Sequence, residues 1–281
     1  MPVGMAFGCS ATLVLSVKYE ANFVASPESV IVGGFEVSRL SRSELTDVVS
    51  GKTTSETAPL RSEAKLLFSL NGHALALSRQ HDGYRRSLED ADIIHVDGEP
   101  LVIASRWLTK TPVRERSATT DLFHDISEAA ERKGLSIYLL GATPQIVAEC
   151  VSEVKRLYPG LKIAGYRDGY FTEDEEAAVV DQINAAEPDI VWVGMGKPRE
   201  QLFSSRNRAR LKCQWVITCG GCFNFVTGAY QRAPEPLQKA GLEWLHRMVT
   251  RPRQMFWRYL TTNPVAVFML LRNTRAVRMD N

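Results

Sequence analysis

The sequence predicts an α/β protein in which a mostly parallel, doubly wound sheet is followed by a C-terminal helical appendage. Three observations predict this class. Short runs nearly continuous in Val, Ile and Leu are typical of strands buried on both faces of a parallel sheet, and helical patterns separate them at the spacing of βαβ units. After Gly228, arginines and aromatic residues follow at helical spacing. We therefore expect a loosely ordered leader over 1–28, a core over 29–230 and an appendage over 231–281.

The apolar runs are expected to form the strands of the core. In chain order they are Val30–Val32, Lys65–Leu70, Asp92–Val96, Leu135–Leu140, Leu161–Tyr166, Asp189–Val193 and Trp215–Thr218. Helix-start signals lie between them: Ser41 and Glu44 have the spacing of a capping box, and Thr143–Pro144 places a cap before a proline at the first helical position. Gly134 and Gly160 are expected to end the preceding helices.

The appendage is basic. Ala233–Val249 and Arg253–Arg278 have helical patterns, which we expect to be broken at Pro252 and Pro264. Residues 244–281 hold seven arginines and one aspartate, a net +6 that leaves −4 for the rest of a chain whose total is +2. This block predicts an acidic partner: anionic lipid, diphosphate or nucleic acid. Because the arginines alternate with aromatic and aliphatic side chains that can insert into lipid, we favour an anionic membrane surface and expect no nucleic acid.

Composition excludes several classes of protein. With 44% hydrophobic and 23% charged residues, the chain is typical of a soluble globular protein. Its five cysteines are too few for a disulfide framework, and Cys219–Cys222 lacks the second pair of a zinc site. The histidines show no metal-ligand spacing, so we expect no metal. The longest apolar run is the eight residues Pro264–Leu271, short of the roughly 20 that span a bilayer, and no signal peptide is recognised. We expect a cytoplasmic protein.

Ligands of open parallel sheets bind beyond the carboxyl ends of the strands. Asp97 follows the Asp92–Val96 strand and precedes a glycine, a position suited to a general base. A helix cap or turn aspartate is the alternative, and spacing alone slightly favours it.

Three glycine turns at other strand ends could bind a nucleotide or another anion. One could expose free amides to a phosphate or nucleoside and comprises Gly141, Ala142 and Thr143. A second contains Gly194, Gly196, Lys197, Arg199, Glu200 and Gln201 and could form an anion cradle. A third contains Gly220 and Gly221, which permit close approach of a ligand to the backbone. Ordinary turns are the alternative for all three. Likewise, Arg116 could hold a phosphate or lie in a surface loop, with Thr120 or Asp121 capping the helix that follows.

Taken together, these segments resemble the WecG/TagA/CpsF family of bacterial glycosyltransferases over about residues 30–265. The parts that carry the resemblance are Val32–Gly34, Ser69–Asn71, Ala91–Gly98, Arg116–Leu122, Tyr138–Thr143, Gly165–Phe171, Pro188–Ile190, Gly194–Arg199, Arg232–Pro234 and Gly241–Arg247. Each is short, but their order and spacing together are specific.

The resemblance implies a Rossmann-like core and an inverting, metal-independent transfer without a cofactor. A hexosyl or N-acetylhexosaminyl group would pass from a UDP-sugar donor to a polyprenyl-diphosphate-linked sugar, in cell-surface polysaccharide synthesis. The protein would lie on the inner face of the cytoplasmic membrane, with a homo-oligomer possible. Asp97 would be the general base, with Ser69 and Asn71 lining the sugar site. Arg116, and Arg247 and Arg253 from the appendage, would face diphosphate, and Gly141, Ala142 and Thr143 would contact the nucleotide.

The chain also departs from the family pattern. Glu200-Gln201 stands where Gln-Glu is usual, Asn224 replaces a common Asp, and Thr119 stands where Gly is usual. Either Gln201 makes the diphosphate contact through a local shift or that contact is lost.

Two other functions stay open. One is a non-catalytic scaffold that docks polysaccharide machinery on the membrane, which the reversed Glu200-Gln201 order slightly supports. The other is a nucleotide-dependent oxidoreductase, which the lack of a G-x-G-x-x-G after the first strand disfavours.

Overall fold

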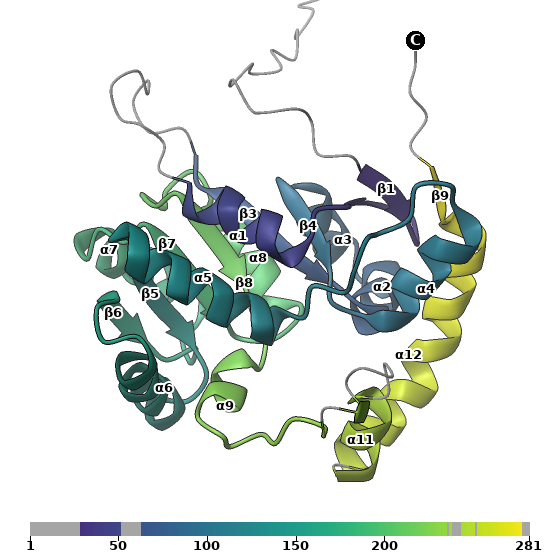
Figure 1. Cartoon of the computed structure of the whole chain (residues 1–281). Coiled ribbons are helices and arrows are strands. Elements are labelled where there is room, and N and C mark those ends of the chain that lie inside the picture. Colours follow the sequence, from purple (N-terminus) through teal and green to yellow (C-terminus); the bar gives the residue numbers. More distant parts are fainter. Residues whose placement is uncertain (1–28, 52–62, 235, 238–242, 251, 277–281) are drawn as a thin grey trace, which may run out of the picture.

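A computed structural model of the chain describes residues 29–51, 63–234, 236–237, 243–250 and 252–276 (Figure 1). Within the last two ranges, the side chains of 243, 244, 247, 250 and 252–256 are not described. The predicted leader over 1–28 therefore lies outside the described residues.

The core is a six-stranded, all-parallel sheet, as the apolar runs predict. Its strands are β3 (Lys65–Leu70), β4 (Ile93–Val96), β5 (Ser136–Gly141), β6 (Lys162–Arg167), β7 (Ile190–Gly194) and β8 (Trp215–Thr218), in the order β4-β3-β8-β7-β5-β6. Both faces are buried: on β3, Leu66 and Phe68 pack into one apolar cluster and Leu67 into the other. Burial on both faces explains why most of these strands show nearly continuous apolar runs, whereas the edge strand β6 is only partly buried.

Helices flank the sheet (Figure 1). They are α1 (Arg42–Ser50), α2 (Gly72–Gln80), α3 (Asp82–Glu89), α4 (Glu99–Leu108), α5 (Thr119–Lys133), α6 (Pro144–Leu157), α7 (Glu176–Ala185), α8 (Arg199–Asn207), α9 (Cys222–Val226), α11 (Glu243–Thr250) and α12 (Pro252–Asn273), with a 3₁₀ turn at Glu173–Glu175. The capping box of Ser41 and Glu44 is confirmed, as is the cap by Thr143. Gly134 ends α5 with φ 65°, a left-handed conformation that glycine adopts without strain. Gly160 does not end α6, which stops earlier and is capped by Tyr158.

The first predicted strand belongs to a different sheet. β1 (Ser29–Val32) pairs antiparallel with β2 (Phe35–Ser38) and with β9 (Arg275–Ala276). Gly33 and Gly34 form the two-residue turn between β1 and β2 with φ of 61° and 93°, which suits a tight hairpin and not a crossover. The expectation that Val30–Val32 joins the parallel sheet is therefore wrong.

The C-terminal segment returns to the N-terminal part of the core. α12 packs along α2 and contacts α4, burying Ala266, Met269 and Leu270 (Figure 1). The backbone amide of Gly34 donates to the Asn273 carbonyl at 2.9 Å. The predicted break at Pro264 is wrong, because α12 continues through this residue. Packing against α2 offsets the one backbone hydrogen bond that the proline removes.

Candidate active site

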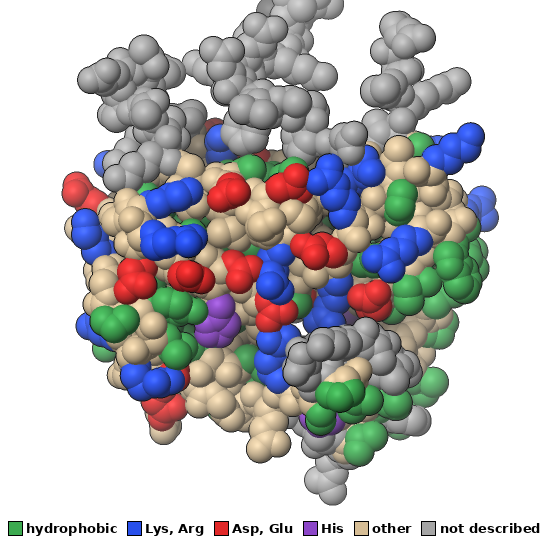
Figure 2. Space-filling view, in the orientation of Figure 1, with side chains coloured by type: hydrophobic (Ala, Val, Ile, Leu, Met, Phe, Trp, Pro, Cys, Tyr) green, Lys and Arg blue, Asp and Glu red, His purple; other side chains and the backbone are tan. Residues whose placement is uncertain are grey.

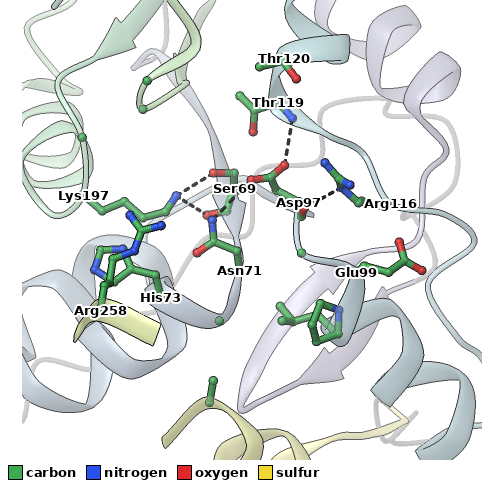
Figure 3. Close-up of a pocket in the computed structure, with 18 of the residues that line it drawn as sticks. Ser69, Asn71, His73, Asp97, Glu99, Arg116, Thr119, Thr120, Lys197 and Arg258 are labelled. Carbon is green, nitrogen blue, oxygen red and sulfur yellow. Dashed lines mark hydrogen bonds between the residues drawn. The ribbon is translucent and has the colours of Figure 1, made fainter. Parts of the chain in front are cut away.

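A cavity of about 580 Å³ opens at the carboxyl ends of β3, β4, β7 and β8. Its walls come from the segments that follow these four strands and from one side of α12 (Figure 3). Among the predicted site residues, it brings together Ser69, Asn71, Asp97, Arg116, Gly196, Gly220 and Gly221. A cavity with several convergent polar groups at this edge of an open sheet is where a ligand is expected.

Asp97 lines the cavity and also contacts the start of a helix. Its backbone amide donates to the Leu70 carbonyl at 2.9 Å, which fixes the residue beside the end of β3. Its Oδ1 accepts from the backbone amide of Thr119, the first residue of α5, at 3.2 Å. Neither Thr120 nor Asp121 caps α5, contrary to expectation, since its N-cap is Ala118 with no side-chain cap bond. The Asp97 carboxylate thus anchors a helix start while it lines the cavity.

Asn71 holds the second oxygen of that carboxylate. Its Nδ2 donates to Asp97 Oδ2 at 3.4 Å (Figure 3), and its Oδ1 accepts from the Ala74 amide at 3.1 Å as the N-cap of α2. The cap fixes which side of the Asn71 amide faces Asp97. The carboxylate is consequently oriented from two elements.

Lys197, which the sequence indicates only as part of a glycine turn, holds Ser69. Lys197 Nζ donates to Ser69 Oγ at 2.7 Å and to the Ser69 carbonyl at 2.9 Å. Burial lowers the pKa of Lys197, while Glu200 and Asp97 oppose that shift. Lys197 follows β7 and faces the cavity (Figure 3). The position of Lys197 after the end of β7 could have indicated a site residue. The same turn holds other polar residues, however, and spacing alone does not show which of them faces the cavity.

Glu200 is fully buried and joins two of the glycine turns. Its Oε2 accepts from the backbone amides of Gly196 and Gly220, each at 2.9 Å. Burial raises the pKa of Glu200, and Lys197 and these hydrogen bonds act against that shift. Gln201, also fully buried, donates to Glu200 Oε1 at 3.1 Å and Thr218 Oγ1 at 3.2 Å and does not line the cavity. The order of Glu200 and Gln201 is reversed relative to the family pattern, and of these two residues it is Glu200 that lines the cavity.

The predicted arginines take different positions. Arg116 lines the cavity, and its Nε donates to the Asp97 carbonyl at 3.0 Å. Arg199 does not line it, because its guanidinium donates to the Phe171 carbonyl and lies 4.9 Å from the centroid of the Phe171 ring. Arg247 and Arg253 belong to α11 and α12, and their side chains lie outside the described residues.

The remaining glycine-turn residues lie outside this cavity. Gly141 ends β5 and is followed by Ala142 and Thr143, and Gly194 ends β7. A Cβ on Gly141 would come within 2.3 Å of the Gly194 carbonyl oxygen, so close strand packing requires glycine there. The Ala142 amide donates to that same oxygen at 3.0 Å. Their nucleotide contacts remain a prediction.

Two further cavity residues were not selected from the sequence. His73 lies on the first turn of α2 and Arg258 on α12 (Figure 3). Burial, with the charges of Arg258 and Lys197, lowers the pKa of His73 to about 4. Because His73 follows the cap Asn71 by two residues, the helix start could have indicated it. Arg258 is one of seven arginines in the tail, and only the fold of α12 distinguishes it.

Among the described residues, no group of three or more His, Cys, Asp or Glu side chains that could hold a metal ion is found. Cys219 and Cys222 are buried, and burial raises the pKa of the Cys219 thiol well above its usual range. A thiol with a raised pKa is a poor nucleophile.

Comparison with known proteins gives consistent matches. The family described as "Glycosyl transferase WecG/TagA/CpsF family" matches residues 30–279. An N-acetylglucosaminyldiphosphoundecaprenol N-acetyl-beta-D-mannosaminyltransferase of Bacillus spizizenii (strain ATCC 23059 / NRRL B-14472 / W23) is 33% identical over 234 residues, 83% of this chain and 88% of the relative. A protein of the same name from Bacillus subtilis (strain 168) is 31% identical over 202 residues, 72% of this chain and 77% of that relative.

Proposed function

This chain belongs to the WecG/TagA/CpsF family of glycosyl transferases, and from that premise we propose its substrates and its catalytic groups. The enzyme transfers a hexosyl or N-acetylhexosaminyl group from a UDP-sugar to a polyprenyl-diphosphate-linked sugar. The Bacillus relatives are named for N-acetylmannosamine transfer to N-acetylglucosaminyldiphosphoundecaprenol, so this pair is the first to be tested. The single observation that carries the proposal is the Asp97 carboxylate, held from two elements in a cavity with Arg116 and Lys197.

Asp97 acts as the general base. Its carboxylate takes the proton of the acceptor hydroxyl as that oxygen bonds to the anomeric carbon. The bond from this carbon to the β-phosphate oxygen breaks with its electron pair, and attack from the opposite side inverts the configuration. The Asn71 amide and the Thr119 backbone amide orient the carboxylate at 3.4 and 3.2 Å. Ser69 and Asn71 line the sugar site.

The departing diphosphate gains negative charge, which cationic side chains neutralise without a metal ion. Arg116 takes this role, and its hydrogen bond to the Asp97 carbonyl, which keeps it beside Asp97, supports the assignment. Arg247 and Arg253 assist from the appendage. Addition of EDTA tests this part of the proposal, because a metal-dependent transfer would stop.

Attachment to the membrane completes the proposal. None of the helices in the described ranges is both long and apolar enough to cross a bilayer. Large apolar side chains of α12 are nevertheless exposed, among them Trp257 at 66% and Leu271 at 68%. Figure 2 shows hydrophobic side chains gathered on the side of the molecule along which α12 runs in Figure 1. This face and the arginines around it hold the enzyme on the inner face of the cytoplasmic membrane.

A donor panel tests the assignment. Purified enzyme is incubated with a prenyl-diphosphate-N-acetylglucosamine acceptor and, in turn, UDP-N-acetylmannosamine, other UDP-N-acetylhexosamines and UDP-hexoses. We expect UDP release that depends on the acceptor for at least one donor. UDP release that is equal with and without acceptor would contradict transfer. The family match already disfavours the oxidoreductase alternative.

A further inference from the structure

The described hydrogen bonds of Lys197 include none to a carboxylate. An ammonium group has three N–H donors, and the two hydrogen bonds of Nζ go to neutral oxygens of Ser69. Within the described part of the chain, Lys197 forms no ion pair with a carboxylate. A desolvated cation without a close counter-ion is unfavourable.

The two nearby carboxylates are engaged elsewhere. Glu200 uses Oε2 for the amides of Gly196 and Gly220 and Oε1 for Gln201. Asp97 accepts from other groups at both oxygens, from the Thr119 amide and from Asn71. Both attract Lys197 electrostatically, yet burial dominates and lowers the pKa of the lysine. An anionic ligand would supply the missing partner.

One further cation, Arg258, lies on the same side of the cavity. Figure 3 shows Arg258 and His73 next to Lys197, across from Arg116, and the charges of Arg258 and Lys197 both lower the pKa of His73. The groups that face Lys197 are thus Glu200 on α8, Asp97 after β4, Cys219 after β8, His73 on α2 and Arg258 on α12. Since His73 is neutral at neutral pH, Lys197 and Arg258 provide the positive charge of this wall.

The ammonium is close to the proposed reacting centre. Ser69, which it binds, lies on β3 in register with His95 of β4. Asn71 and Asp97 are each two residues further along and bond to each other. An anion bound by Lys197 is therefore held beside the carboxylate that takes the proton.

We propose that Lys197 is a diphosphate-binding catalytic residue whose ammonium contacts a diphosphate group of one substrate. This inference rests on the proposed function. In the transfer, the acceptor oxygen bonds to the anomeric carbon, its proton passes to Asp97, and the carbon–oxygen bond to the diphosphate breaks with its electrons remaining on phosphate. Lys197 stabilises that charge if the diphosphate is the donor's. If it is the acceptor's, Lys197 fixes the position of the attacking sugar.

Calorimetric binding of two probes, UDP and a short-chain prenyl-diphosphate-N-acetylglucosamine, distinguishes the two sources. Lys197→Met should weaken binding of one of them by about 10- to 100-fold, the usual effect of losing a hydrogen bond to a charged group. Uridine, which lacks phosphate, should bind both proteins equally. Lys197→Arg should recover most of the affinity, and Lys155→Met, at an exposed lysine of α6, should leave it unchanged.

A thermal-shift measurement guards against misfolding of the variant. Folded Lys197→Met protein should lose the rise in Tm that the affected probe gives with the wild type. Unchanged affinity of Lys197→Met for both probes would overturn the inference and leave the proposed function intact. Wild-type protein that binds neither probe would contradict both together.

Discussion

The Thr119 backbone amide donates to Asp97 Oδ1 at 3.2 Å, so the carboxylate proposed as the base also anchors the first residue of α5. This bond joins two segments 22 residues apart and turns the start of α5 toward the cavity. Any substitution of Asp97 therefore acts on structure as well as on proton transfer, and the two effects must be separated.

Asp97→Asn separates them. Its amide oxygen can still accept from Thr119, although its NH₂ group then faces Asn71 Nδ2 and the bond at 3.4 Å is lost. An amide is not a base at neutral pH, so we expect turnover to fall by about 10²- to 10⁴-fold, with a smaller loss of Tm than in Asp97→Ala. Asp97→Ala also removes the acceptor and should lower the free energy of unfolding by about 1–3 kcal/mol. Turnover and thermal melts of both variants provide the check. An Asn variant with near-wild-type turnover would refute the base assignment.

Glu200 should make stability depend on pH. Its pKa is raised on folding above the usual 4.5, so the stability it contributes is present below pH 4.5 and is lost as pH rises through the folded-state pKa. Glu200→Gln is always neutral, and Gln201 can turn its carbonyl oxygen toward the new amide. The free energy of unfolding of Glu200→Gln, relative to wild type, should therefore grow as pH rises from 4.5. Urea melts at pH 4 to 8 measure this difference, and a flat or falling difference would be inconsistent with it.

Removing the Glu200 side chain tests its link between the glycine turns. Glu200→Ala leaves the part-buried amides of Gly196 and Gly220 without their acceptor, at a cost of about 1 kcal/mol for each unpaired group, the lower end of the range for buried groups. We expect lower stability and a higher KM for the donor. Exposed Glu187→Ala is the matched control. Equal KM values in both variants would show that the turns do not depend on Glu200.

His73 should titrate near pH 4. Because its pKa is depressed from 6.5 to about 4, the stability it contributes is present above pH 6.5 and is lost as pH falls toward 4. NMR of the imidazole carbon protons gives the midpoint directly. Lys197→Met removes one of the charges that lower this pKa, so the midpoint should move upward. A midpoint near 6.5 in the wild type would show that His73 is neither buried nor close to these cations.

The exposed face of α12 should control binding to vesicles. Leu260→Glu and Leu271→Glu place charge at exposed apolar positions, and we expect each to reduce binding to phosphatidylglycerol vesicles about tenfold. Leu157→Glu, at a partly exposed leucine of α6, is the control. Point substitutions are preferable to truncation, because α12 also buries Ala266, Met269 and Leu270. Unchanged co-sedimentation of both α12 variants would contradict membrane attachment through this face.

The strands of the parallel sheet were predictable because burial on both faces leaves a continuous apolar signal. The antiparallel sheet of β1, β2 and β9 was not predictable, because β9 has only two residues and pairs with β1, almost 250 positions away. Likewise, helical pattern predicted the tail, but its continuity through Pro264 depends on packing against α2, which local sequence does not encode.

The site was predictable where a residue directly follows a strand. Asp97 and Gly220 were found in this way and Asn71 through the family resemblance, and the cavity brings the three together. Lys197 could not be ranked above Arg199 in the same turn. Only the fold shows that Lys197 turns toward Ser69, whereas Arg199 stacks on Phe171. The role of Glu200 was also hidden, because its partners are backbone amides of two separate turns.

Mass spectrometry of the lipid-linked acceptor tests the central claim most directly. Wild-type enzyme, a UDP-sugar donor and prenyl-diphosphate-N-acetylglucosamine are incubated with EDTA, in parallel with Asp97→Asn. We predict that the wild type adds the mass of one sugar to the acceptor and releases one UDP for each, while the variant leaves the acceptor almost unmodified. Equal sugar addition by the two proteins, or none by the wild type with any donor of the panel, would contradict the account.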